Sequence, residues 1–403
     1  MLSSWLSNQP ADFFRKRMTP TIKIGFLVPY SSISPSMSKD IVDGFYSAIP
    51  EPYRALFQFV PEYVDKGGIE LVKVAINKLV MFHNVDIVSG IVSYKLIEEI
   101  APMLERQRKL AFFFDSGEYL PPLTSMSKGI FFNSLQTWQL EYALGVWAQR
   151  HFSGKGALLM SVYEAGYHMH SAFCQGALSS GAEEIDMHVL PFNPQEPSIE
   201  GALMPFFEKI ERSGVNYLHA LFCGAEAHEF FACYKKMGLH TQIPLVITPH
   251  MATEEILCAI EGLNITSFSA SGWDYHSAHD KNLQFKNAYQ IAIGRKPTEF
   301  SVMGYEMGLL FTMLMPVLQR GDRVEIIKSV SSAYVDGPRG LRDFNHSINA
   351  TPPAIDIEKI TVKHNRASKL VIDQGTALQY TNSAFMDIHT QCVSGWKNPY
   401  LCV

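Results

Sequence analysis

Long hydrophobic runs are missing from this sequence. The longest candidate, residues 309–318, is interrupted by Pro316 and reaches about half of the roughly 18 apolar residues that a membrane-spanning helix needs. Charge is also sparse, at 18% of residues, while 47% are hydrophobic, so the chain is too apolar for a disordered protein. A length of 403 residues then predicts two globular domains, or three small ones.

Cysteine and surplus positive charge are scarce as well. Six cysteines are too few for a disulfide scaffold, and none has the C-x-x-C spacing of a zinc or redox site. Cys392 and Cys402 could still bridge a C-terminal loop in an oxidising compartment. The chain has 34 Lys and Arg against 39 Asp and Glu, a net charge of −5. Without a basic surplus to neutralise phosphates, we expect no nucleic-acid partner.

Recognisable catalytic and metal-binding motifs are absent. The sequence has no G-x-S-x-G nucleophile elbow and no G-x-x-x-x-G-K-[ST] phosphate loop. His168 with His170, and His276 with His279, are spaced somewhat like metal ligands, but neither pair forms H-E-x-x-H, which favours solvent-facing or capping roles. We therefore expect no catalysis, no metal and no cofactor. The alternative is an α/β enzyme of hydrolase type that acts on a small amide or ester.

The N-terminus gives an expectation about the compartment. It begins MLSSWLSNQPADFFRKRM, in which the basic residues follow a weakly apolar stretch, whereas a secretory leader puts them before it. We expect a cytoplasmic protein. The alternative is a periplasmic protein whose leader was removed before this numbering begins.

Short apolar runs alternate with amphipathic segments of 10–15 residues, which predicts parallel βαβ units. The alternation runs twice in similar order, so we expect two Rossmann-like α/β lobes. The expected strands are 22–28, 56–60, 85–88, 110–114, 156–160, 185–190, 217–222, 244–248 and 265–269. The expected helices are 39–48, 68–83, 94–107, 136–151, 169–180, 199–213, 226–237, 280–294 and 302–318, followed by a β-rich tail from about 337.

Residues that directly follow the strands are the candidates for a binding site, because ligands of open parallel sheets bind beyond the carboxyl ends of the strands. Hydroxyls, aromatic rings and glycines dominate these positions. Ser93 and Ser116 could donate to a carboxylate or an amide oxygen, and Tyr30, Tyr94 and Tyr163 offer flat walls with one polar tip. The alternative is that the serines only cap helices and form turns.

Several of these segments together resemble the type I periplasmic-binding-protein fold, in the branch of the branched-chain amino-acid-binding proteins of ABC importers and the related amide-sensing regulators. The resemblance covers residues 22 to about 362. Its motifs are IKIGFLVPYSS, VDIVSGIVSY, KLAFFFDSGEYL, GALLMSVYEAGYHMHSAF, VNYLHALFCGAEAHEFFACYKKMGL, GRKPTEFSVMGYEMGLLF and GPRGLRDFNHSIN.

The resemblance implies two lobes with parallel sheets, joined by three hinge crossings, with the ligand clamped between them. By position it assigns 21–135 and 264–343 to the first lobe, and 136–263 and 344–380 to the second. An N-terminal extension, 1–20, and a C-terminal tail, 381–403, flank them.

The resemblance also implies roles for single residues of the site. Ser93 matches the hydroxyl that binds the carboxylate or amide of the ligand. Ser116 matches a second hydroxyl donor, and Gly117 a neighbouring backbone contact. Tyr163 matches a pocket tyrosine of the second lobe.

Ala225 or Glu226, together with His250, fall where the second lobe completes the site. The amino-acid binders have a carboxylate at the position of His250, which holds the ammonium of the ligand, and a neutral imidazole replaces that charge poorly. Glu164, Glu226 or Asp115 could supply it instead. The ligand could therefore be an amide or a urea-like molecule as well as an amino acid.

From these observations we expect a solute-binding protein that captures a small polar ligand by hinge closure, since a ligand that contacts both lobes favours the closed state. In transport its partner would be an ABC permease, and in sensing a cytosolic signalling protein. A homodimer stays open.

Overall fold

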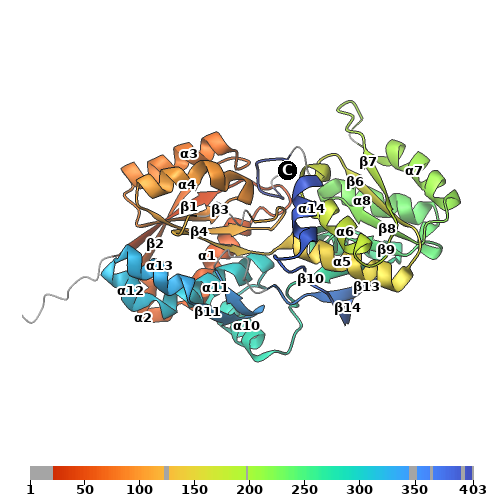
Figure 1. The fold of residues 1–403 in the computed structure, drawn as a ribbon. Helices are drawn as coiled ribbons and strands as arrows, with labels where there is room; N and C mark the ends of the chain where they lie inside the picture. The colour runs from red at the N-terminus through yellow and green to blue at the C-terminus, as the bar shows by residue number, and fades with distance from the viewer. Residues whose placement is uncertain are drawn as a thin grey trace, which may run out of the picture.

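The computed structural model describes residues 21–121, 127–196, 198–344, 352–363, 366–391 and 395–401. Outside these residues lie the expected N-terminal extension, the middle of the third crossing between the lobes, and the two cysteines Cys392 and Cys402. Two lobes stand side by side, each built on one sheet, and helix α14 (Ser383–Gln391) lies between them (Figure 1).

The first lobe contains a five-stranded parallel sheet with the order β2-β1-β3-β4-β5. All residues of β3, β4 and β5 are buried, as expected for strands that helices cover on both faces. The strands are β1 (Ile22–Val28), β2 (Phe57–Tyr63), β3 (Ile87–Ile91), β4 (Leu110–Asp115) and β5 (Ile130–Ser134), the last of which was not among the expected strands.

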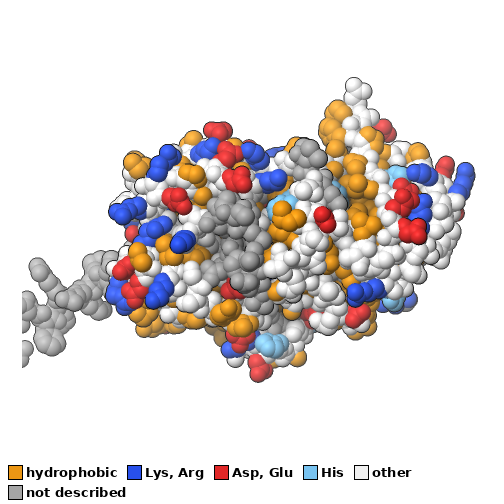
Figure 2. Space-filling model, in the orientation of Figure 1, with side chains coloured by type: hydrophobic (Ala, Val, Ile, Leu, Met, Phe, Trp, Pro, Cys, Tyr) orange, Lys and Arg blue, Asp and Glu red, His pale blue; other side chains and the backbone are white. Residues whose placement is uncertain are grey.

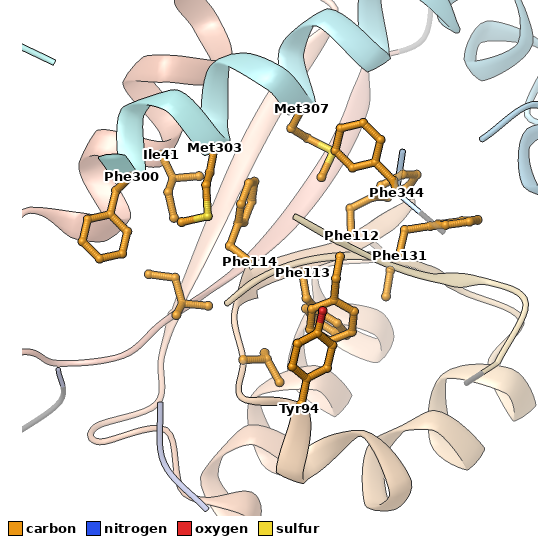
Figure 3. Packing of buried hydrophobic residues seen from close by; sticks show 14 of the residues in the cluster. Ile41, Tyr94, Phe112, Phe113, Phe114, Phe131, Phe300, Met303, Met307 and Phe344 are labelled. Carbon is orange, nitrogen blue, oxygen red and sulfur yellow. The ribbon is translucent and has the colours of Figure 1, made fainter. Parts of the chain in front are cut away.

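Helices flank this sheet, and aromatic side chains fill the space between the layers. Along β4 the side chains alternate between the two faces of the sheet. Phe112 packs on Phe311 of α11 with ring centroids 5.0 Å apart, while Phe113 packs on Phe132 at 5.5 Å on the other face (Figure 3). The helical segments are α1 (Met37–Ala48), α2 (Glu51–Arg54), α3 (Ile69–Asn77), η1 (Lys78–Phe82), η2 (Tyr94–Leu96), α4 (Ile97–Arg106), α10 (Asp280–Ile293), α11 (Glu299–Met313), α12 (Met315–Arg320) and α13 (Arg323–Ser331).

The second lobe contains a seven-stranded sheet with the order β14-β13-β10-β9-β8-β6-β7. Its strands β6 to β10 pair in parallel, but β13 pairs antiparallel with β10, and β14 antiparallel with β13, so this sheet is mixed where only parallel pairing was expected. The strands are β6 (Gly156–Ser161), β7 (Ile185–Leu190), β8 (Tyr217–Leu221), β9 (Leu245–Ile247), β10 (Thr266–Ser271), β13 (Asp356–Lys363) and β14 (Arg366–Gln374).

The helical segments of the second lobe lie between these strands along the chain. They are α5 (Thr137–Phe152), η3 (Glu164–Gly166), α6 (Met169–Leu178), α7 (Glu200–Arg212), α8 (Gly224–Lys236), η4 (Leu239–Thr241), η5 (Pro249–Ala252), α9 (Glu254–Ala259) and η6 (Glu261–Leu263).

The chain crosses between the lobes three times, as the fold class predicts: from β5 to α5, from β10 to α10, and from β12 (Gly340–Asp343) to β13. Strand β12 forms a separate two-stranded ribbon with β11 (Tyr334–Gly337). Because β10 pairs with β9 and β13, it belongs to the sheet of the second lobe. The expected lobe boundary before residue 264 is therefore wrong, and the second crossing follows Ser271.

Buried polar groups hold together the elements next to the crossings between the lobes. The guanidinium of Arg339 donates to the carboxylate of Glu306 (Nε, 3.0 Å), to the carbonyl of Ser134 (Nη1, 2.9 Å) and to Oδ1 of Asn133 (Nη2, 2.6 Å). Burial would raise the pKa of Glu306, but the charge of Arg339 outweighs burial and lowers it. This ion pair joins α11, the end of β5 and the turn before β12.

Candidate functional site

The serines expected to bind the ligand stand at the carboxyl ends of β3 and β4, but each is engaged with its own lobe. Ser93 is fully buried, and its Oγ accepts a hydrogen bond from the backbone N–H of Lys95 (3.4 Å) at the start of η2. Ser116 donates to the carboxylate of Glu118 at 2.8 Å. The capping role that the sequence left open for serines is therefore present at Ser93, while its role toward a ligand stays a prediction.

Gly117 forms the turn that brings this loop against the first lobe crossing. Its φ of +81° lies in the left-handed region, and a Cβ at this position would collide with the backbone of Gln136. The carbonyl of Gly117 accepts a hydrogen bond from the N–H of Trp138 at 2.9 Å. Glycine is thus required here by the close approach of two backbones.

Asp115 and Tyr94 lie inside the first lobe. Tyr94 packs its ring on Phe132, with centroids 4.5 Å apart, in the hydrophobic core (Figure 3). Asp115 is fully buried, and its carboxylate accepts a hydrogen bond from Ser134 at 3.2 Å. Burial raises the pKa of Asp115 well above its usual range, and the nearby carboxyl of Glu118 raises it further. This shift favours the neutral carboxylic acid, which is a poorer partner for an ammonium group than a carboxylate.

Tyr30, Ala225 and Glu226 lie at the margin of the site. Tyr30 is 55% exposed, and Ala225 is also exposed, at the start of α8. Glu226 is half-buried; burial raises its pKa, and the nearby hydroxyl of Ser161 counteracts part of that effect.

Tyr163 and His250 of the second lobe do lie together, around Tyr400 near the C-terminal end of the described chain. The ring centroid of Tyr400 is 4.2 Å from that of His250, 5.0 Å from that of Tyr167 and 6.3 Å from that of Tyr163. Tyr400 is 1% exposed. Aromatic side chains thus surround the phenol ring of Tyr400. The sequence predicted such tyrosine walls around a ligand.

The segment of residues 395–401, here called the cleft segment, also contacts the second lobe through its polar groups. The indole Nε1 of Trp396 donates to the carbonyl of Tyr163 at 2.7 Å, and the N–H of Trp396 donates to the carbonyl of Gly166 at 3.3 Å. The amide of Asn398 donates to the phenol oxygen of Tyr163 at 3.3 Å. Three polar groups of η3 and the residue before it therefore accept hydrogen bonds from the cleft segment: the carbonyl and the hydroxyl of Tyr163 and the carbonyl of Gly166.

On the opposite side the cleft segment contacts the first lobe. The hydroxyl of Ser31, in the loop after β1, donates to the carbonyl of Leu401. The ammonium of Lys397 lies 2.5 Å from the carboxylate of Glu99 on α4. The two lobes thus meet the same short segment at the ends of their strands and helices.

The charges that face Tyr400 are weak. Burial raises the pKa of Glu164 to about 7, and the nearby hydroxyl of Tyr400 and thiol of Cys223 offset part of that rise. Burial lowers the pKa of His250 to about 3, so its imidazole is neutral near pH 7. The second lobe therefore presents a neutral ring and a carboxyl group that is close to half-protonated.

Sequence reasoning named Glu164 only as an alternative charge and missed Ser31, Tyr167 and the cleft segment as parts of the site. Ser31 stands in the serine-rich loop directly after β1, so its position was a usable signal. The cleft segment has the aromatic sequence GWKNPYL and follows the last strand. Its position in the fold depends on contacts with residues that are distant in the sequence, so the sequence pattern did not reveal it.

The rest of the described surface shows few features of another kind of site. Within the described residues no group of three or more His, Cys, Asp and Glu could hold a metal ion, and no helix there is long and apolar enough to cross a membrane. Acidic and basic side chains are interspersed on the face seen in Figure 2. A hollow of about 260 Å³ opens near Ile22, Lys109 and Arg323, where β1 and β4 begin, and includes none of the expected site residues.

Comparison with known proteins gives a family and a fold. A family model described as periplasmic binding protein matches residues 21–352. No curated protein sequence matches the chain. A similar solved structure is the ABC transporter substrate-binding protein from Sphaerobacter thermophilus, with 18% identity, 88% of this chain and 97% of that chain covered, and a TM-score of 0.74.

Two further solved structures contain ligands. One is a solute-binding protein of an ABC transporter from Rhodopseudomonas palustris HaA2 in complex with p-hydroxybenzoic acid (18% identity, 90% of this chain and 98% of that chain, TM-score 0.71). The other is a branched-chain amino acid transporter substrate-binding protein from Streptococcus pneumoniae in complex with isoleucine (13% identity, 87% and 99%, TM-score 0.64). The predicted fold and resemblance are confirmed, and this chain belongs to the periplasmic binding protein family.

Proposed function

We propose that this protein is a solute-binding protein that captures a small ligand between its two lobes, for ABC-type import or for ligand sensing. The proposal rests on one observation: both lobes contact the same short peptide, the cleft segment. Ser31 of the first lobe and Tyr163 and His250 of the second lobe contact neighbouring residues of it. A group held in this way favours the state in which both lobes touch it. Family membership supports the same role.

For the ligand we propose a small carboxylic acid or amide with an aromatic or apolar body. Tyr163, Tyr167 and His250 form aromatic walls, and Ser31 offers a hydroxyl donor to an oxygen of the guest. The solved relatives hold both classes of ligand, p-hydroxybenzoic acid in one and isoleucine in another. The neutral His250, in the place of a carboxylate, favours the aromatic acid, because an α-ammonium group would lack an ionised partner there.

The downstream partner decides between transport and sensing. An ABC permease requires the protein outside the cytoplasmic membrane, whereas a cytosolic signalling partner requires it inside. Of these two roles we propose the cytosolic sensor. Fractionation of cells that express the full gene tests this choice: recovery in the periplasm would favour the transport role.

The binding role is tested by calorimetry with 4-hydroxybenzoate, benzoate and isoleucine. Replacement of Ser93 by Ala should weaken binding of the best of these probes by about 1–2 kcal/mol, because one hydrogen bond at the carboxyl end of β3 is lost. The matched control is Ser89→Ala, which removes a buried hydroxyl of the same strand whose hydrogen bond goes to the carbonyl of Phe112. If Ser93→Ala and Ser89→Ala bind the probe with equal affinity, Ser93 is not part of the binding site. If none of the three probes binds, the proposed ligand classes are contradicted.

A further inference from the structure

The place proposed for an external ligand is filled by the protein's own chain. Resting on the proposed function, we infer that the cleft segment is an intramolecular ligand: it competes with the external solute for the interlobe site, and Tyr400 stands where the aromatic ring of that solute binds. The competition sets how much free solute is needed before the protein responds.

Tyr400 and Leu401 make the contacts expected of a ligand. The Tyr400 ring is enclosed by aromatic groups that follow β6 and β9, and its hydroxyl faces Glu164. The carbonyl of Leu401 accepts from Ser31, which follows β1. Residues at the carboxyl ends of strands are where parallel sheets bind their ligands.

The protein surface around the cleft segment is shaped to fit it. A Cβ at Gly166 would collide with the indole ring of Trp396, and a Cβ at Gly67 would lie 2.6 Å from Cδ of Pro399. The hydroxyl of Tyr119, in the loop after β4, donates to the carbonyl of Trp396 at 2.8 Å. Both lobes thus have space and partners at matching points along the segment.

Helix α14 anchors the chain close to the place where the cleft segment binds. Helix α14 packs against α6, and its Phe385 and Ile388 are buried in one cluster with Trp138 of α5. A segment attached close to its site has an effective concentration on the order of millimolar, so even weak contacts keep it bound. An external ligand then binds with an affinity reduced by the fraction of molecules whose site is free.

The occupant also indicates the class of solute. A guest that replaces Tyr400 and Leu401 needs a flat ring, a hydroxyl that reaches Glu164 and a carbonyl or carboxylate oxygen that accepts from Ser31. This is the chemistry of a hydroxylated aromatic acid. Glu164, with a pKa of about 7, can accept from a phenol when ionised and donate to it when protonated.

Occupancy is tested first, by hydrogen exchange on the wild-type protein without ligand. The N–H of Trp396 is hydrogen-bonded to Gly166, so peptides that cover residues 395–401 should exchange slowly. Saturation with 4-hydroxybenzoate should release that protection. Fast exchange in the free protein, or protection that persists in the complex, would overturn the inference.

Competition is tested by calorimetry with 4-hydroxybenzoate on the wild type, Tyr400→Ala and Trp396→Ala. Both variants should bind the probe at least tenfold more tightly, while Met386→Ala, at a position 60% exposed on α14, should bind like the wild type. Equal affinity of the wild type and both cleft-segment variants would overturn competition although the protein binds solute. Binding to none of the four proteins, with the segment protected, would instead contradict the proposed ligand class, and with it the competition.

Discussion

At Glu164 a single carboxyl group is held in a surrounding that disfavours its charge. Its folded-state pKa is about 7 against an ordinary value of 4.5, because burial removes water from the carboxylate. Between these two pH values the folded protein keeps a proton that the unfolded chain has released. Stability from this group is therefore complete below pH 4.5 and is lost as the pH rises through 7, by up to about 3 kcal/mol.

Replacement of Glu164 by Gln should remove this dependence, since the amide does not ionise. The difference in unfolding free energy between Glu164→Gln and the wild type, from urea titrations, should grow with pH in favour of the variant across this window. His168 and His250 have lowered pKa values and act in the opposite direction, but they are present in both proteins and cancel in the difference. The exposed Glu98→Gln is the control, and a difference as flat as in that control would contradict the burial of Glu164.

For single residues of the site, the sequence predicted the position along the chain but not the groups that each side chain contacts. The position of Ser93 follows from the end of an apolar run, and a serine before a helical turn is as good a cap as a ligand contact. Tyr94 directly follows Ser93, and the turn of η2 directs its ring into the core against Phe132. Ligand contacts depend on side-chain direction, which neighbouring elements decide.

Two pairs of helices approach each other through glycine, one pair in each lobe. In the first lobe a Cβ at Gly304 of α11 would collide with the carbonyl of Ile41 on α1, and one at Gly44 would collide with Ser301. In the second lobe Gly145 of α5 is equally close to the backbone of α6. In each pair the backbone contact fixes the distance between the two helices.

Gly304→Ala should therefore destabilise the protein by about 2 kcal/mol, because the added methyl group overpacks a contact that backbone atoms form. Alanine would otherwise stabilise a helix by up to about 1 kcal/mol relative to glycine. Gly201→Ala, at an exposed position of α7 whose Cβ would meet only the side chain of Glu196, is the matched control and should be neutral or stabilising. Denaturant titration measures both, and equal effects would show that α1 and α11 separate easily.

The elements themselves were mostly predictable, because local pattern defines them. β1 and β7 have the expected limits, since short apolar runs between polar loops identify buried strands. β5 was missed, as a five-residue run gives little periodicity. β10 was placed in the wrong lobe, because its partners β9 and β13 come from separate parts of the chain. The expected β-rich tail also contains α14.

At the scale of the whole molecule, three crossings, the cleft segment and direct contacts connect the lobes. The backbone N–H of His168 in the second lobe donates to the carbonyl of Glu118 in the first lobe at 3.0 Å, and the N–H of Leu120 donates to Nδ1 of His168 at 3.1 Å. The crossings limit how far the lobes separate, while the cleft segment contacts Ser31, Glu99 and Tyr119 on one side and Tyr163 and His250 on the other. Contacts that exist only when the lobes are together favour that arrangement by their own free energy. The segment thus acts on the lobe equilibrium as a bound solute would.

Removal of both aromatic anchors, in Trp396→Ala/Tyr400→Ala, should shift the free protein toward separated lobes and raise its radius of gyration in small-angle X-ray scattering. Saturating 4-hydroxybenzoate should return the radius to the wild-type value, because the solute replaces the lost contacts. Met386→Ala should scatter like the wild type in both conditions. An unchanged radius in the double variant would mean that the crossings and the direct contacts of Glu118 and Leu120 with His168 hold the lobes together without the cleft segment.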